Sequence, residues 1–183
     1  MPVSPNELHI GSKAHAFSLP AADGNVYSLS DFADKDVLCI IFSCNHCPYV
    51  KAVEERINNI TKKYSDSSFA LVCINSNDDS VYPEDSFEMM KKRAAEKGFV
   101  FPYLRDESQT AAKAYDAVCT PDIYLYDKAR ILKYRGRIDD NWKDESAVKS
   151  KDLERAIDLL LAGKEIDFDM VPSMGCSIKW NKT

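Results

Sequence analysis

The sequence has no excess of positive charge and no long apolar run, and both absences narrow the class of protein. Its 183 residues carry a net charge of −5, which argues against a nucleic-acid-binding surface or a polybasic membrane patch. The longest apolar run, Val37–Phe42, is far shorter than the roughly 20 residues of a transmembrane helix. The first eight residues lack the basic and apolar regions of a signal peptide. We therefore expect a soluble, cytoplasmic protein with no nucleic-acid or membrane partner.

Internal repeats and low-complexity linkers are also missing, which indicates one domain. A chain of this length can bury roughly 70% of the surface that its unfolded form exposes, so it needs no disulfide or metal to hold its fold. Periodicity is lost after Gly163. We expect a domain over residues 1–163 and a tail over residues 164–183, which should dock because it contains the apolar residues Phe168, Met170, Ile178 and Trp180.

Apolar patterning predicts an α/β fold with a mixed central sheet. Val37–Phe42 and Phe69–Asn75 are typical of strands buried on both faces, and two further strands are predicted at Ile123–Tyr126 and Leu132–Arg137. An N-terminal hairpin is expected from His15 to Leu29, around the turn Asp23-Gly24-Asn25. Helical spacing and end signals predict helices around Val50–Tyr64, Asp85–Lys97, Gln109–Tyr115 and Lys151–Leu161.

Two of the six cysteines, Cys44 and Cys47, form a C-x-x-C pair between the strand at Val37–Phe42 and the helix that follows. In a cytoplasmic protein such a pair is expected to be catalytic or metal-binding. A helix N-terminus stabilises a thiolate and so lowers the pKa of a thiol there. We expect Cys44 to be exposed and to attack a disulfide, and Cys47 to resolve the mixed disulfide. His46 should stabilise the thiolate further.

A structural zinc site is the first alternative for this pair. Such a site needs two further ligands, often from a second C-x-x-C. The sequence has neither a second pair nor an H-x-x-x-H motif, and His9 and His15 lie far upstream. We therefore expect no metal and no cofactor.

The segments around the pair carry a family resemblance, which extends from about Ile10 to Ile138. They are Gly11–Leu19, the C-x-x-C itself, Phe101–Asp106 and Thr120-Pro121. With these segments the chain resembles the thioredoxin-like superfamily, in its branch of peroxiredoxin-related proteins and thiol–disulfide reductases.

The resemblance implies a thioredoxin-like fold, with a mixed sheet flanked by helices and an N-terminal β-hairpin extension. It implies that Pro121 is cis and faces the C-x-x-C, and that Thr120 offers backbone groups to an extended substrate. The activity implied is thiol–disulfide exchange with a protein or small-molecule disulfide and an unidentified electron donor.

Three departures from thioredoxin mark this site as a variant. Ser43 stands where thioredoxins have Trp, and Asn45-His46 stands between the cysteines in place of Gly-Pro. The strand Val37–Phe42 also has no counterpart of the buried Asp that serves proton transfer to the second cysteine. Another proton acceptor, water or an acid from elsewhere in the chain, must then serve Cys47.

Two other activities stay open. Peroxiredoxins hold a peroxide-reducing cysteine in a T-x-x-C-P motif, and Cys44–Pro48 fits that motif with cysteine in place of threonine. The missing threonine hydroxyl counts against this peroxidase alternative. The second is a binding module that holds Cu(I) through its thiolates, although relatives in that role tend to have a longer C-x-x-x-C and a distant His ligand.

The other four cysteines are assigned by their positions. Cys119 lies two residues before Pro121 and is a candidate third redox thiol, with a small buried core residue as the alternative. Cys176, on the tail, is a candidate relay or cap for Cys44, or a bystander. Cys39 and Cys73 lie within apolar strands and are expected to be inert.

Overall fold

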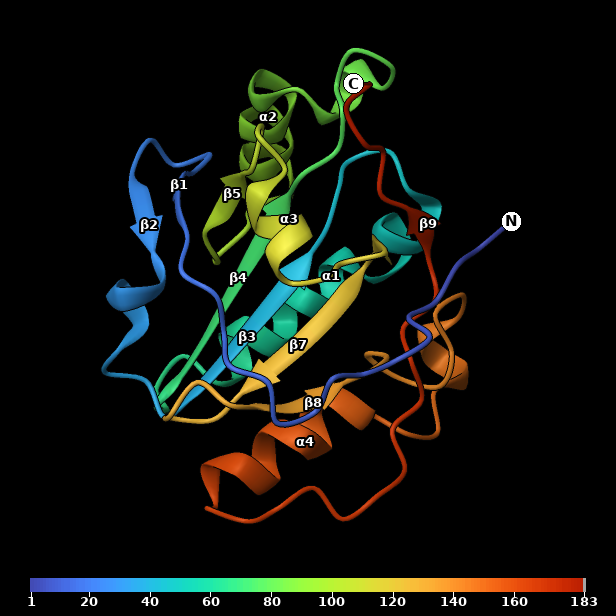
Figure 1. The fold of residues 1–183 in the computed structure, drawn as a ribbon. Coiled ribbons are helices and arrows are strands. Elements are labelled where there is room, and N and C mark those ends of the chain that lie inside the picture. Colours follow the sequence, from blue (N-terminus) through green and yellow to red (C-terminus); the bar gives the residue numbers. More distant parts are fainter. Residues whose placement is uncertain (183) are drawn as a thin grey trace.

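A five-stranded mixed sheet forms the centre of the computed structural model, which describes residues 1–182. Along the sheet the order is β5-β4-β3-β7-β8 (Figure 1). β3 pairs in parallel with β4 and antiparallel with β7, while β5 is parallel to β4 and β8 antiparallel to β7. The strands are β3 (Val37–Phe42), β4 (Phe69–Asn75), β5 (Tyr103–Arg105), β7 (Asp122–Tyr126) and β8 (Leu132–Arg135).

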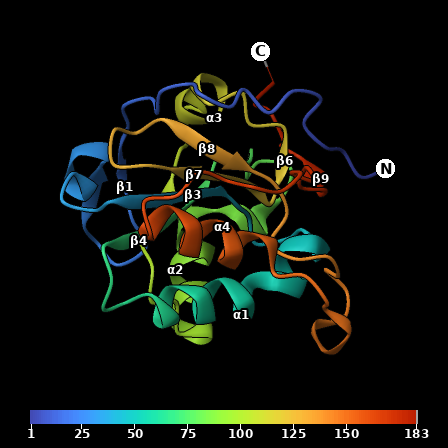
Figure 2. The same ribbon diagram turned by 90° about the horizontal axis from the view of Figure 1, so that it is seen from below.

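Helices cover both faces of this sheet (Figure 2). One face carries α1 (Pro48–Lys63), α2 (Phe87–Lys97) and α4 (Asp152–Leu161); the other carries α3 (Thr110–Ala114) and the N-terminal segment. The side chains of β3 alternate between the two cores, with Cys39 and Ile41 in one and Ile40 and Phe42 in the other. Because both faces of β3 are buried, all of its residues are apolar. The predicted mixed α/β sheet is confirmed.

The predicted element bounds agree closely with the structure for β3 and β4, whose residues match those expected. The expected hairpin is present as β1 (Ser18–Pro20) and β2 (Val26–Ser28). Gly98, in the left-handed conformation with φ at 59°, ends α2 as expected. Single turns of 3-10 helix complete the described chain: η1 (Leu29–Phe32), η2 (Pro83–Asp85) and η3 (Glu145–Ala147).

Three short strands were not predicted: β5, β6 (Cys119–Thr120) and β9 (Cys176–Ser177). Each has two or three residues, too few to show a period. β6 and β9 pair antiparallel with each other outside the central sheet, so that Thr120 lies opposite Cys176. This pairing brings the end of the chain to the start of β7.

The C-terminal tail is hydrogen-bonded to the domain along several stretches. Gly175 exchanges two backbone hydrogen bonds with Val3, at 2.8 and 3.0 Å. Further along, the amide of Asp78 donates to the carbonyl of Lys179 at 2.8 Å. Ile178 is buried in the core beside α3. Within residues 1–182, no helix is long and apolar enough to cross a membrane.

Candidate active site

The site lies at one end of the central strands, where three of them meet because of their directions. β3 and β4 are parallel and both end there, while β7 is antiparallel to β3 and begins there. Phe42, the last residue of β3, lies opposite Asp122, the first residue of β7. The loop that follows β3 therefore carries Cys44 and Cys47 directly against the segment that precedes β7.

Thr120 contacts both cysteines of the pair. Its Oγ1 lies 3.2 Å from Cys44 Sγ, and its carbonyl oxygen lies 3.2 Å from Cys47 Sγ, which in the thiol form donates to it. The Thr120–Pro121 peptide bond is cis, as the resemblance implied. The two cysteines are free in this structure, which therefore represents the reduced state.

Both thiols are sealed from solvent. Cys44 is 1% exposed and Cys47 0%, so the expectation of an exposed Cys44 is wrong. They form a small apolar cluster with Val50, against which Tyr49 and the tail residue Cys176 pack. A bulky disulfide cannot contact either sulfur unless part of this cover moves.

The helix N-terminus stabilises a thiolate at Cys47 rather than at Cys44. α1 begins at Pro48, in the first helical position that proline favours, so Cys47 is the N-cap and Cys44 lies outside the helix. The hydrogen bond from the Cys44 thiol lowers the pKa of Cys47 to about 4 against the opposing effect of burial, with help from Cys176 and the Val50 amide. Burial raises the pKa of Cys44 well above its ordinary value. The expected lowering at Cys44 is therefore reversed.

Asp85, from η2, is the buried acid that the strand before the pair lacks. It is 0% exposed and accepts four hydrogen bonds: from the Asn45 amide at 2.6 Å, His46 Nδ1 at 2.5 Å, Asn77 Nδ2 at 2.9 Å and Asn75 Nδ2 at 3.2 Å. Burial alone would raise the pKa of Asp85, but these donors outweigh it and lower the pKa. The carboxylate is thus held ionised beside Cys44.

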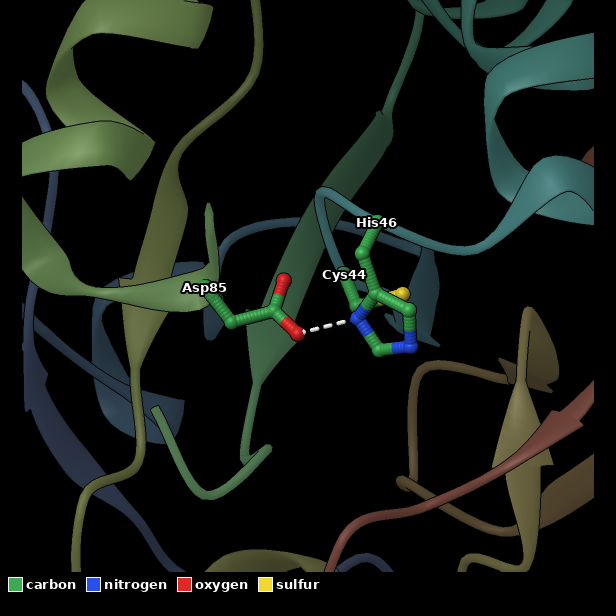
Figure 3. Close-up of side chains that lie close together, drawn as sticks. All are labelled: Cys44, His46 and Asp85. Atoms are coloured by element: carbon green, nitrogen blue, oxygen red, sulfur yellow. Dashed lines mark hydrogen bonds and ion pairs between the residues drawn. The ribbon is translucent and has the colours of Figure 1, made fainter. Parts of the chain in front are cut away.

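His46 bridges Asp85 and the surface. Its imidazole is stacked on Tyr82 with the ring centroids 4.1 Å apart, and its side chain is 14% exposed. Figure 3 shows Nδ1 of the ring directed at the Asp85 carboxylate, with Cys44 close to both side chains. Because Asp85 is ionised, it favours the ring tautomer with the proton on Nδ1, which leaves the other ring nitrogen as an acceptor. Asp85 and His46 together can therefore accept a proton from Cys44.

Ligand atoms of Cys44, His46 and Asp85 all lie within 4.8 Å of one another, a spacing that could bring them around a metal ion. The donor set does not fit that use as arranged. Both oxygens of Asp85 already accept hydrogen bonds, two on each. Its short contact with His46 Nδ1 is a hydrogen bond rather than a ligand-to-ligand distance across an ion. The cluster is better suited to proton transfer.

Buried hydrogen bonds also fix the segment before β7. Asp122 forms an ion pair with Arg135 of β8, with Oδ2 and Nη2 2.8 Å apart, and both side chains are almost fully buried. The same carboxylate accepts from the Val118 amide at 3.2 Å. The position of Thr120 relative to the two thiols therefore depends on a pair that water does not screen.

The two candidate additional thiols, Cys176 and Cys119, lie in different environments. Cys176 is half-buried and packs on the Cys44–Cys47 cluster. Cys119 is fully buried, and its thiol donates to the carbonyl of Pro121 at 3.5 Å; burial raises its pKa. Cys39 and Cys73 are buried in the core. Of the four, only Cys176 joins the cluster.

Comparison with known proteins places this site in a family. The Redoxin family model matches residues 9–155, so the chain belongs to the Redoxin family and has the thioredoxin-like fold. No protein among the curated proteins matches this chain.

Solved structures resemble the whole chain. An uncharacterized conserved protein from Geobacillus kaustophilus is 43% identical, with a TM-score of 0.95 over 100% of this chain and 98% of its own. A hypothetical protein from Sinorhizobium meliloti 1021 is 40% identical, with a TM-score of 0.93 over 98% and 99%. The thioredoxin domain of a thiol-disulfide oxidoreductase from Bacteroides vulgatus is 20% identical, with a TM-score of 0.60 over 70% and 89%, and shares the fold.

Proposed function

We propose that this Redoxin family protein is a thiol–disulfide oxidoreductase whose redox centre is the Cys44–Cys47 dithiol. The observation that carries the proposal is the contact of both sulfurs with Thr120 while their pKa values shift in opposite directions. A thiol–thiolate pair of this kind is suited to form and release a disulfide. Its partners are a disulfide substrate, protein or small molecule, and an electron donor.

The opposite pKa shifts set the order of attack. In the reduced state Cys47 is the thiolate, so its sulfur attacks the substrate disulfide, forms a mixed disulfide and expels one substrate thiolate. Cys44 then passes its proton toward His46 and Asp85 and attacks Cys47 Sγ, which expels the second substrate thiolate. Two electrons move to the substrate, and the Cys44–Cys47 disulfide remains. This order reverses the roles expected from the sequence.

Disulfide reduction with dithiothreitol as the electron donor tests the proposal. Insulin and a small disulfide should both be measured, with the wild type beside Cys44→Ser and Cys47→Ser. We expect both variants to lose the catalysed rate. Cys73→Ala is a matched control because Cys73 lies in the core and outside the dithiol cluster, and it should keep the rate. Equal rates for the wild type and the two site variants would contradict the proposal.

A thiol peroxidase is the second candidate, and the position of Cys47 favours it. Cys47 caps α1, Pro48 follows at the first helical position, and the thiol has a lowered pKa. The Cys47 thiolate would attack hydrogen peroxide to give a sulfenic acid and hydroxide, and Cys44 would condense with it to a disulfide and water. The wild type should then oxidise rapidly with stoichiometric peroxide, and Cys44→Ser should accumulate a sulfenic acid that dimedone labels. Slow oxidation without label would rule this activity out.

A further inference from the structure

Cys176 is the outermost of the three thiols at this site. Cys44 and Cys47 are sealed, whereas Cys176 is half-buried, so part of its surface meets solvent. A disulfide too large to enter the protein can therefore contact Cys176 without any movement of the fold. Contact with Cys44 or Cys47 requires local opening, which lowers the exchange rate.

The backbone places Cys176 beside the dithiol by a defined register. In the β6–β9 pair Cys176 lies opposite Thr120, the residue that contacts both buried sulfurs. The preceding residue is Gly175, where a Cβ would lie 2.0 Å from the Thr120 carbonyl oxygen. Only glycine lets the tail approach β6 this closely.

Side-chain chemistry connects Cys176 with Cys47 in particular. It packs on the cluster of Cys44, Cys47 and Val50. The Cys176 thiol and amide both stabilise the Cys47 thiolate, and burial, together with this neighbour, raises the pKa of Cys176 to about 11. A thiolate next to a thiol is the arrangement from which a disulfide between them can form and exchange.

We infer that Cys176 is a relay thiol that carries electrons from the buried dithiol to external disulfides. This inference rests on the proposed function and changes its first step. Cys176, which meets solvent, attacks the external disulfide in place of Cys47, whose direct attack requires local opening. The tail is then part of the redox centre. Its docking leaves the Cys176 thiol partly exposed to solvent and shields the thiols of Cys44 and Cys47 from it.

Each step of the relay is a thiol–disulfide exchange. The Cys176 sulfur, having lost its proton, attacks the substrate disulfide and forms a mixed disulfide, and one substrate thiol leaves. The Cys47 thiolate attacks Cys176 Sγ, which releases the second substrate thiol and leaves a Cys47–Cys176 disulfide. Cys44 loses its proton and attacks Cys47 Sγ, which frees Cys176. The sum is two electrons to the substrate and one Cys44–Cys47 disulfide, with two protons passed to the product thiols.

Oxidised glutathione added to the reduced full-length protein tests the relay. The reaction is quenched with acid and N-ethylmaleimide at a series of times, and tryptic peptides are analysed by mass spectrometry. Cys44 and Cys47 share the peptide of residues 36–51, while Cys176 lies in that of residues 165–179. In Cys44→Ser the last step is blocked, so we expect these two peptides to become joined by a Cys47–Cys176 disulfide.

The rate with Cys176→Ser gives the second readout. We expect the Cys44–Cys47 disulfide to form about tenfold more slowly than in the wild type, because exchange then depends on local opening. Ser177→Ala, at the exposed neighbour on β9, is the matched control and should keep the wild-type rate.

Two results overturn the relay alone: an unchanged rate in Cys176→Ser, or mixed disulfides with glutathione but no joined peptides in Cys44→Ser. If the wild type forms no Cys44–Cys47 disulfide at all, the proposed function fails as well. The failure of the relay and the failure of the dithiol are therefore separate outcomes of one experiment.

Discussion

The two cysteines of the C-x-x-C pair lie in opposite environments although two residues separate them. The Cys44 side is polar: an ionised Asp85, held by four donors, and the imidazole of His46 lie against it. The Cys47 side is the N-terminus of α1, with apolar neighbours and the tail thiol. Burial and, to a smaller extent, the Asp85 carboxylate therefore oppose ionisation of Cys44, while thiols and backbone amides favour ionisation of Cys47.

This contrast shows that the chemistry of a C-x-x-C motif depends on where its helix begins. A helix that began at Cys44 would stabilise a thiolate there. Because α1 begins at Pro48, that stabilisation passes to Cys47, and the buried charge of Asp85 reinforces the difference. In a C-x-x-C motif, either the first or the second cysteine can therefore be the attacking thiolate, depending on where the helix begins.

Removal of the Cys44 thiol should have the largest effect on the difference between the two cysteine environments, because it changes the pKa of Cys47. In Cys44→Ala the Cys47 thiolate loses its strongest stabilising contact, so the pKa of Cys47 should rise from about 4 toward the ordinary value near 8.5. Ultraviolet absorbance of the thiolate, followed against pH, measures the shift. A titration identical to that of the wild type would contradict the assignment of the thiolate to Cys47.

The same shift predicts how stability depends on pH. The native pKa of Cys47 lies below its unfolded value of about 8.5, so ionisation of this thiol adds stability above the unfolded pKa. That contribution is lost as the pH falls through the native value near 4. The free energy of unfolding should therefore fall less between these two pH values in Cys44→Ala than in the wild type, as urea denaturation at each pH would measure.

Asp85→Asn disrupts the polar surroundings of Cys44. The substitution removes a buried charge and leaves some of its four donors without an acceptor, so we expect a loss of about 3 kcal/mol in the free energy of unfolding. It should also lower the pKa of Cys44, because the neighbouring negative charge is gone. Urea denaturation measures the loss. Asp66→Asn, at an exposed position, is the control and should leave both quantities unchanged.

Gly175→Ala disrupts the cover on the Cys47 side without a change in any thiol. The added Cβ cannot fit against the Thr120 carbonyl, so β9 should detach from β6. We expect alkylation of Cys47 by iodoacetamide to become about tenfold faster, which corresponds to about 1.4 kcal/mol less opening free energy. Ser177→Ala should match the wild type. If Gly175→Ala alkylates at the wild-type rate, the tail does not seal the site.

His46→Ala should have the smallest effect. A positive charge on the imidazole would stabilise the thiolates, and hence the reduced form, but the ionised Asp85 that the ring contacts would offset most of that charge. We expect the reduction potential to fall by about 15 mV, equivalent to roughly 0.7 kcal/mol for a two-electron couple. Equilibration with glutathione measures the change. A rise in potential would show that His46 destabilises the reduced form.

Much of the fold could be predicted from the sequence because its signals are local. The apolar runs of β3 and β4 and the glycine after α2 each mark an element by neighbouring residues. The cis bond before Pro121 followed from a motif that the family shares. Pro48 could also have placed the start of α1 correctly, since proline favours the first helical position.

The parts of the site that escaped prediction depend on contacts between distant segments. Asp85 reaches His46 across 39 positions, from a short 3-10 turn with no periodic signal. The strands β9 and β6 have two residues each, and neither contains a pattern from which their pairing could be predicted. Cys44 lies among side chains from distant segments, Thr120, Asp85 and Cys176, so its exposure could not be judged from its own neighbours in the sequence.

A redox titration shows whether Cys44 and Cys47 form a reversible two-electron couple. The protein is equilibrated in glutathione buffers of graded ratio, alkylated, and analysed for the state of the peptide over residues 36–51. We expect one two-electron transition in the wild type, and in Cys44→Ser no Cys44–Cys47 disulfide at any ratio. Cys44 and Cys47 that remain free thiols in the wild type at every ratio would contradict this expectation.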